Sequence, residues 1–160
     1  MSERTNPEAG YSAIMGMSVR VSGAVPIRVD AHHIGTPEQE VALTLGSVLV
    51  YMRSRQTAAA VVQGWRSAAV AAQCLGPARP LRDHRAALVS VMGSQVSALV
   101  RLGGLPTVTA APVPRQKGTP TPTHVRIQVG PLVWQVCDWN AYERIAEGWR
   151  RGLRILSAAD

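Results

Sequence analysis

Hydrophobic and polar residues alternate along two short stretches, one near each end of the chain. In residues 18–30, SVRVSGAVPIRVD, apolar positions alternate with Arg20 and Arg28, and Ser22-Gly23-Ala24 can form a turn. In residues 124–138, HVRIQVGPLVWQVCD, the same alternation turns at Gly130-Pro131. A period of two residues is that of a strand with one buried face, so each stretch predicts a β-hairpin. Because a lone hairpin is marginally stable in water, we expect the two to form one antiparallel sheet.

Helical periods dominate between the two hairpins. Thr36-Pro37-Glu38-Gln39 combines a Thr N-cap, a proline at the first helical position and a Gln that can close a capping box, which predicts a helix over 36–52. Leu43 and Val50 lie opposite its main apolar stripe, so we expect this helix to be sandwiched in the core or to meet another chain. Further helices are expected over 57–75, 83–102 and 140–157. The pattern leaves open whether residues 37–75 form one continuous helix.

Residues 106–123 contain five prolines and several threonines, which predicts an extended, solvated loop. The two hairpins lie on either side of it, so we expect the loop to belong to one domain. The prediction is therefore a flexible N-terminus over residues 1–12 and a single α+β domain over 13–160. In that domain two β-hairpins form one antiparallel sheet packed against three to four helices, in the order ββααα-loop-ββα.

The chain also contains a faint internal echo. Val19-Arg20-Val21 is similar to Val125-Arg126-Ile127, and Gln63-Gly64-Trp65-Arg66 is similar to Glu147-Gly148-Trp149-Arg150. The two pairs are 106 and 84 residues apart, so a duplication would require a large insertion. The echo is only a hint that two hairpin-plus-helix halves pack in a similar way.

The chain carries a formal net charge of +7, and its middle is strongly basic. Between Val41 and Cys137 the only acidic residue is Asp83, against ten Arg and Lys. Lys117 is the only lysine, and the preference for Arg over Lys is typical of a GC-rich bacterial coding sequence rather than of phosphate recognition. The net charge itself favours a polyanionic partner or an acidic protein surface.

Neither a secretory signal nor a membrane span is indicated by the pattern. The first ten residues, MSERTNPEAG, lack the charged, apolar and small regions of a signal peptide, so we expect a cytoplasmic protein. The longest apolar run, residues 41–52, is far shorter than the ~20 residues that cross a bilayer, and we expect no membrane partner.

Two groups of residues could carry chemistry. Cys137-Asp138 could form a reactive site if His124 came within reach, but the pattern favours a junction between a strand and a helix. Asp30, His32 and His33, completed by Asp83, could form a metal-dependent hydrolase centre, which is the third-ranked hypothesis. No phosphate loop, nucleophile elbow or spaced zinc pattern is present, so we predict no catalytic residue, no metal ligand and no cofactor.

The leading hypothesis is a non-enzymatic protein that binds DNA or RNA through the solvent face of its sheet. If the helices cover the apolar face, the other face presents Arg20, Arg28, Arg126 and Gln128 to phosphates and base edges. Arg115 and Lys117 on the proline-rich loop would assist. Without aromatic residues among them, stacking on single strands is not indicated. An ordinary solvated sheet face has the same composition. The alternative is a homodimer or other partner-binding protein with Leu43 and Val50 at the interface.

Overall fold

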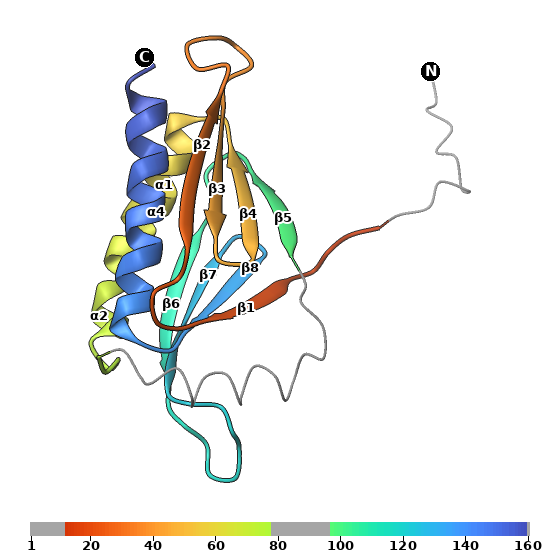
Figure 1. The fold of residues 1–160 in the computed structure, drawn as a ribbon. Helices are drawn as coiled ribbons and strands as arrows, with labels where there is room; N and C mark the ends of the chain where they lie inside the picture. The colour runs from red at the N-terminus through yellow and green to blue at the C-terminus, as the bar shows by residue number, and fades with distance from the viewer. Residues whose placement is uncertain (1–11, 78–96, 160) are drawn as a thin grey trace.

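The structure is a computed structural model that describes residues 12–77 and 97–159, and it has an α+β architecture (Figure 1). Within these residues, eight strands form two mixed four-stranded sheets. Sheet A contains, in spatial order, β1 (Met17–Val21), β8 (Leu132–Val136), β7 (His124–Val129) and β6 (Val108–Val113). Sheet B contains β2 (Ile27–His32), β3 (Glu40–Leu45), β4 (Val48–Met52) and β5 (Ala98–Leu102).

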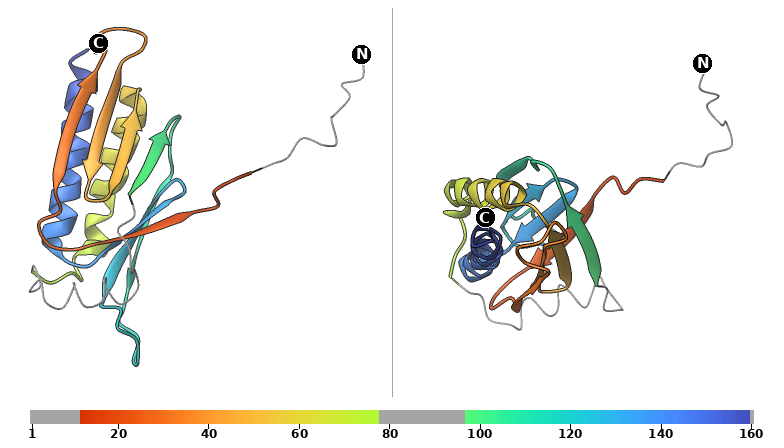
Figure 2. Two further views of the ribbon diagram at one scale, coloured as in Figure 1. Left: turned by 45° about the vertical axis from the view of Figure 1, so that its right-hand side comes forward. Right: turned by 90° about the horizontal axis from the view of Figure 1, so that it is seen from above.

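A layer of helices covers the inner faces of both sheets (Figure 2). The helices are α1 (Arg55–Ser67), its short continuation α2 (Ala69–Ala72), and α4 (Trp139–Ser157). The long helices α1 and α4 run antiparallel and pack against each other, α1 on β6 and α4 on β2 and β3 (Figure 1). No helix in the described ranges is long and apolar enough to cross a membrane.

The two sheets are built from two copies of the same arrangement of elements. The strands β3 and β4 and the helix α1 correspond to β7, β8 and the first part of α4, each starting 84 residues earlier in the chain. Val41, Gly46 and Gly64-Trp65-Arg66 recur at the same spacing as Val125, Gly130 and Gly148-Trp149-Arg150. The preceding strands β1 and β2 correspond to β5 and β6 with a spacing of 81 residues. The difference lies in the loop between the second and third strands, which spans 33–39 in one repeat and 114–123 in the other.

Each repeat, 17–67 or 98–151, places its first strand in the sheet of the other repeat. Strand β1 pairs in parallel with β8, and β5 pairs in parallel with β4, in the same register. Matching backbone hydrogen bonds begin these pairings: Met17 N donates to Pro131 O at 2.9 Å, and Ala98 N donates to Ser47 O at 3.0 Å. The chain therefore has the form of a strand-exchanged dimer within a single polypeptide. The faint echo of the sequence is a true duplication, but Val19-Arg20-Val21 corresponds to Val100-Arg101-Leu102 and not to residues 125–127.

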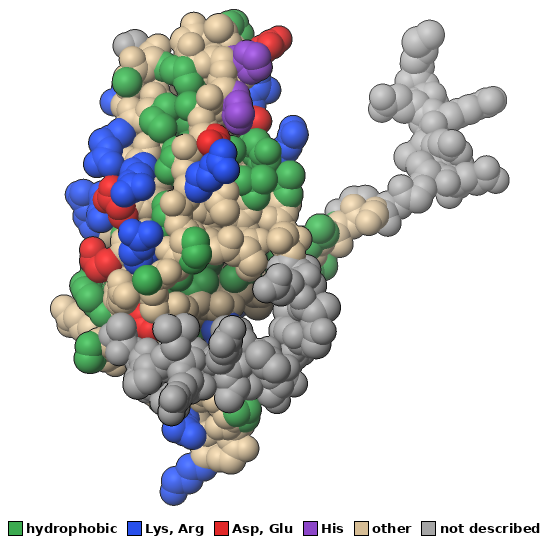
Figure 3. Space-filling view, in the orientation of Figure 1, with side chains coloured by type: hydrophobic (Ala, Val, Ile, Leu, Met, Phe, Trp, Pro, Cys, Tyr) green, Lys and Arg blue, Asp and Glu red, His purple; other side chains and the backbone are tan. Residues whose placement is uncertain are grey.

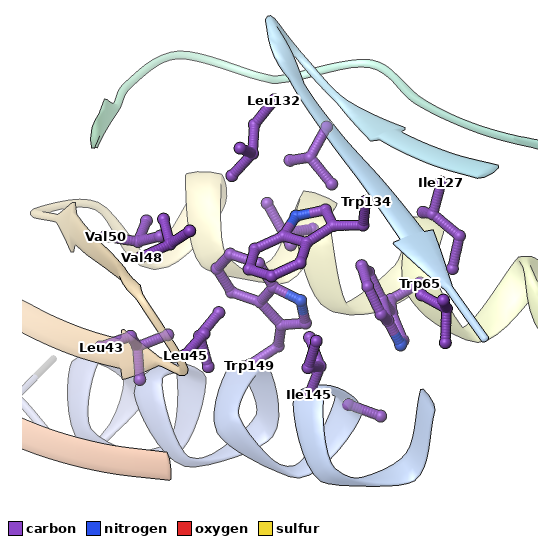
Figure 4. Close-up of a cluster of buried hydrophobic side chains, with 14 of the residues drawn as sticks. Leu43, Leu45, Val48, Val50, Trp65, Ile127, Leu132, Trp134, Ile145 and Trp149 are labelled. Carbon is purple, nitrogen blue, oxygen red and sulfur yellow. The ribbon is translucent and has the colours of Figure 1, made fainter. Parts of the chain in front are cut away.

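The core lies where the inner faces of the sheets meet the helix pair (Figure 4). Trp65 from α1, Trp149 from α4 and Trp134 from β8 are all almost fully buried there. Trp65 and Trp149 are equivalent residues of the two repeats, and their ring centroids are 6.2 Å apart. Trp134 lies edge-on to both. Three large aromatic side chains thus fill the volume that phenylalanines fill in most cores.

The predicted helix over 36–52 is wrong, because the segment forms the loop before β3 and then the hairpin β3–β4. Gly46, with φ of 64°, makes the turn that a helix cannot contain. The Thr36 cap chemistry exists, but it stabilises a turn in which Glu38 N donates to Thr36 Oγ1 at 3.2 Å. Leu43 and Val50 are paired across β3 and β4 and are fully buried in the chain's own core. They are therefore not the outward-facing interface residues that the helix prediction required.

The predicted N-terminal hairpin and single sheet are also wrong, because β1 and β2 belong to different sheets. Residues 98–102 of the predicted helix over 83–102 form strand β5, and the part up to residue 96 lies outside the described residues. The proline-rich segment contains β6, an edge strand that tolerates Pro112. The hairpin 124–136 and the last helix are confirmed as β7–β8 and α4. The predicted flexible N-terminus, up to residue 11, lies outside the described residues.

Candidate functional site

Three of the predicted nucleic-acid contacts lie together on the outer face of sheet A, the face turned away from the helices. The register aligns Arg20 on β1 with Gln135 on β8, and Gln135 with Arg126 on β7. Gln128 follows two residues after Arg126 on the same face, in a row with Ser18, Val133 and Thr109. We call the set Ser18, Arg20, Arg126, Gln128 and Gln135 the basic face.

The two arginines of the basic face are not neutralised by carboxylates. Arg20 Nε donates to Gln135 Oε1 at 3.0 Å, which fixes a half-buried guanidinium across two strands. Arg126 is exposed and bonds to no other described residue. The described strands of sheet A and the loop 114–123 contain neither Asp nor Glu. A polyanion would therefore meet no repelling carboxylate on these elements.

Arg115 and Lys117 lie on the loop between β6 and β7, which extends sheet A at its lower end (Figure 1). Blue side chains project at this end in the space-filling view (Figure 3). The loop is held by two short-range bonds: Arg115 N donates to Thr123 Oγ1 at 3.2 Å, and Thr119 Oγ1 donates to Gln116 O at 3.0 Å. Both cationic side chains are exposed, and the hydrogen bonds of the loop leave them available.

Arg28 does not join the basic face, because β2 is in sheet B. Its guanidinium forms an ion pair with Asp30, with Nε 2.9 Å from Oδ2. The group predicted from the sequence thus divides into five residues on sheet A and its loop and one on the other sheet. The prediction placed all strands in one sheet, and the alternation of residues alone could not separate them.

The outer face of sheet B shows what the duplication has changed. Arg101 is the equivalent of Arg20, but it lies 5.6 Å above the ring of Tyr51, where sheet A has Gln135. Ala42 replaces Arg126, and Asp30 stands where sheet A has Ala111. The same scaffold thus carries a basic and amide face on sheet A and a mixed face with apolar and acidic residues on sheet B. Alignment of the repeats is the sequence signal that could have identified this difference.

Cys137-Asp138 is a strand-to-helix junction, as predicted. Asp138 is fully buried and is the N-cap of α4, where Oδ1 accepts from Ala141 N at 2.8 Å. Its second oxygen, Oδ2, accepts from Gly23 N at 2.7 Å in the other repeat. The cap is Asp138 rather than the predicted Asn140. The residue therefore joins the repeats as well as starting the helix.

The residues of the hydrolase hypothesis are not assembled in the described part of the chain. His32 and His33 are exposed at the turn after β2, and Asp30 is occupied by Arg28. Asp83 lies outside the described residues. Among the residues that the structure describes, no group of three His, Cys, Asp or Glu side chains could hold a metal ion.

The arginines of α4 share acidic partners along the solvent side of the helix. Glu147 accepts from Arg150, Arg151 and Arg154 at 3.0–3.1 Å. Hydrogen bonds from these arginines, led by Arg151, lower the pKa of Glu147 to about 2 against the opposing effect of burial. This face of α4 is thus a network of ion pairs, in agreement with the solvated-face interpretation.

Comparison with known proteins does not add to this description. No protein-family model, no curated protein and no solved structure matches the chain. The function must therefore be argued from the geometry of the molecule.

Proposed function

We propose that this protein binds nucleic acid through the basic face of sheet A. The observation that carries the proposal is the row Arg20–Gln135–Arg126, which spans three adjacent strands without a carboxylate in their sheet. The equivalent row of sheet B, in the same chain, contains an acidic residue and an aromatic ring instead. General basicity of the chain does not account for such a difference between duplicated faces.

The spacing of the row suits a phosphate backbone. Neighbouring strands are about 4.8 Å apart, so Arg20 and Arg126 are held roughly 10 Å apart on either side of Gln135. Arginine guanidinium groups donate to phosphate oxygens, and the amides of Gln128 and Gln135 can donate and accept at base or sugar edges. Arg115 and Lys117 would add phosphate contacts from the loop. Four cationic contacts predict a slope of about −3.6 in a plot of log affinity against log salt on a duplex.

The test is a fluorescence anisotropy titration with duplex and single-stranded DNA and RNA at two salt concentrations. Between about 50 and 200 mM salt, the expected slope weakens duplex binding roughly 150-fold. The double variant Arg20→Gln/Arg126→Gln should bind more weakly and lose about 2 from the slope. The matched control, Arg28→Gln/Arg101→Gln, removes the same charge from sheet B and should bind as the wild type does.

Two results would count against the proposal. Absence of binding at the lower salt concentration would remove it altogether. Equal losses in both double variants would show that net charge, and not the basic face, determines affinity.

Self-association is the second candidate function, and one observation favours it. Ile14, Met15 and Leu99 are exposed by 82%, 92% and 58%, and Ile14 and Leu99 line an apolar groove where β1 and β5 begin. Arg101 is the only charged residue that lines this groove in the described part of the chain, so two chains of charge +7 would repel each other little here. Light scattering over about a hundredfold concentration range should then show a dimer that Leu99→Glu dissociates. Ser18→Glu, at the equivalent position of sheet A, should leave it intact, and a monomer at every concentration would exclude this candidate.

A further inference from the structure

We propose that the groove between α1 and α4 is a binding site for a small aromatic carboxylate. The groove lies at the centre of the helix pair, away from both sheet faces, and has a volume of about 220 Å³. For comparison, a cavity of about 150 Å³ in another protein is large enough to bind benzene. The groove therefore has room for one aromatic ring with a short acidic substituent.

One wall of the groove is a fixed stack of aromatic rings. Trp139, which is 38% exposed, lies at a centroid distance of 5.0 Å from Tyr142, and Tyr142 stacks on Trp65 at 5.9 Å. Trp65 Nε1 donates to Tyr142 O at 3.3 Å, and Tyr142 Oη donates to Trp65 O at 2.6 Å. These reciprocal bonds hold the rings before any ligand arrives, so little ordering is required on binding. The half-exposed Trp139 gives a ligand ring an apolar surface to cover.

The charge of the groove favours an anion. Arg66 lines it from α1 and has neither an ion pair nor a hydrogen bond with described residues. Its equivalent in the other repeat, Arg150, is already engaged with Glu147 and lies 4.0 Å from Glu143. The carboxylate of Glu143 is therefore offset by Arg150, whereas Arg66 retains its full positive charge. A guanidinium beside an aromatic surface recognises a carboxylate through paired N–H donors.

The duplication explains why the groove opens only on one side. Trp139, Tyr142 and Glu143 replace Arg55, Ala58 and Ala59 of the first repeat, so the aromatic wall is present once. Opposite it, Ala69 occupies the position of Leu153 in the second repeat. The small Ala69 side chain leaves the space that a leucine would fill. Ala69→Leu is thus a substitution that the scaffold already accepts at the equivalent position.

The test is an NMR titration of the full chain with phenylacetate, phenylacetamide and acetate. Phenylacetate should bind saturably, shifting the indole N–H signal of Trp139 and the Nε–H signal of Arg66. Phenylacetamide should bind at least about tenfold more weakly, because it lacks the charge that Arg66 recognises. Acetate, which lacks the ring, should produce no saturable shift. Ala69→Leu should abolish binding, and Arg66→Gln should reduce phenylacetate to the affinity of phenylacetamide.

A matched control and a folding check complete the experiment. Arg126→Gln removes the same charge from the basic face and should leave phenylacetate binding unchanged. Circular dichroism and thermal unfolding establish that each variant is folded; if Ala69→Leu is not, Arg66→Gln and the ligand series decide. The proposal is overturned if phenylacetate shows no saturable binding, if a folded Ala69→Leu variant still binds it, or if charge on the ligand or at Arg66 makes no difference.

Discussion

Gly64 and Gly148 are equivalent residues, and each marks the place where a long helix crosses a strand of the other repeat. A Cβ atom at Gly64 would overlap Val108 on β6, and one at Gly148 would lie 2.6 Å from Leu45 Cδ2 and 3.3 Å from Ile27 Cγ2. Ile27 and Val108 are themselves equivalent. The absence of a side chain at these positions lets each helix approach its sheet closely, and this close approach accounts for the recurrence of Gly-Trp-Arg.

Gly64→Ala should lower the free energy of unfolding by about 2 kcal/mol, because the overlap with Val108 outweighs the gain of about 1 kcal/mol in helix propensity. Gly148→Ala should cost less, since the leucine methyl that it meets can move aside. Urea unfolding measures both. Gly76→Ala, which has open space around its Cβ, is the control and should change stability little. Equal stability of Gly64→Ala and Gly76→Ala would contradict the close approach.

Asp138→Ala should destabilise the protein more than the loss of an ordinary helix cap. The substitution removes the cap of α4 and also the acceptor of Gly23 N, and a loss of about 3 kcal/mol is expected. Ser54→Ala, which removes the equivalent cap of α1, should cost about 1 kcal/mol. Denaturant midpoints of the two variants provide the comparison. Similar losses in both would show that the bond to Gly23 contributes nothing.

The ion-pair network around Glu147 should make stability depend on pH in a defined range. Because its pKa is lowered to about 2 in the folded protein, its contribution is complete above the ordinary value of 4.5 and is lost as the pH falls toward 2. Glu147→Gln should therefore be less stable than wild type at neutral pH, by no more than about 1 kcal/mol for so exposed a network. Thermal unfolding from pH 7 to pH 2 should show the two proteins converging below pH 4.5. A constant difference would contradict the assigned pKa.

Gln135→Glu should weaken nucleic-acid binding without disturbing the fold. The new carboxylate has the shape of the amide and can still accept from Arg20, but it neutralises charge midway between Arg20 and Arg126. We expect affinity at low salt to fall about tenfold, the effect of losing one to two phosphate contacts. Gln63→Glu introduces the same charge on α1 and is the control in the anisotropy assay. A similar loss in the two variants would not support the basic face.

Local signals identified the parts of the fold that local interactions determine. The turn Gly130-Pro131 and the stripe of α4 are contained in short windows, and both predictions were confirmed. The segment 36–52 failed because Val41, Leu43 and Leu45 change phase at the turn before Val48. This change of phase imitates a helical stripe, and Thr36-Pro37 added a misleading cap.

The candidate site was predictable in its residue types but not in its arrangement. Arg20 and Arg126 were identified from strand alternation, whereas Arg28 was wrongly grouped with them. Parallel pairing of β1 with β8 joins residues from opposite ends of the chain, and no local pattern encodes it. The duplication was hidden because three additional loop residues shift the spacing from 81 to 84, so that matching short strings paired Arg20 with the wrong partner.

The exchanged strands also impose an order on events during biosynthesis. Arg20 and its partner Gln135 are 115 residues apart, so β1 leaves the ribosome long before the strand that it must join. Sheet A cannot close until β8 has been translated, and until then β1 presents an unpaired apolar edge to the cell. Strand β5, in contrast, follows its partner β4 and can join sheet B as soon as it emerges. The two halves of a symmetric architecture therefore mature at different times, and the half that carries the basic face is completed last.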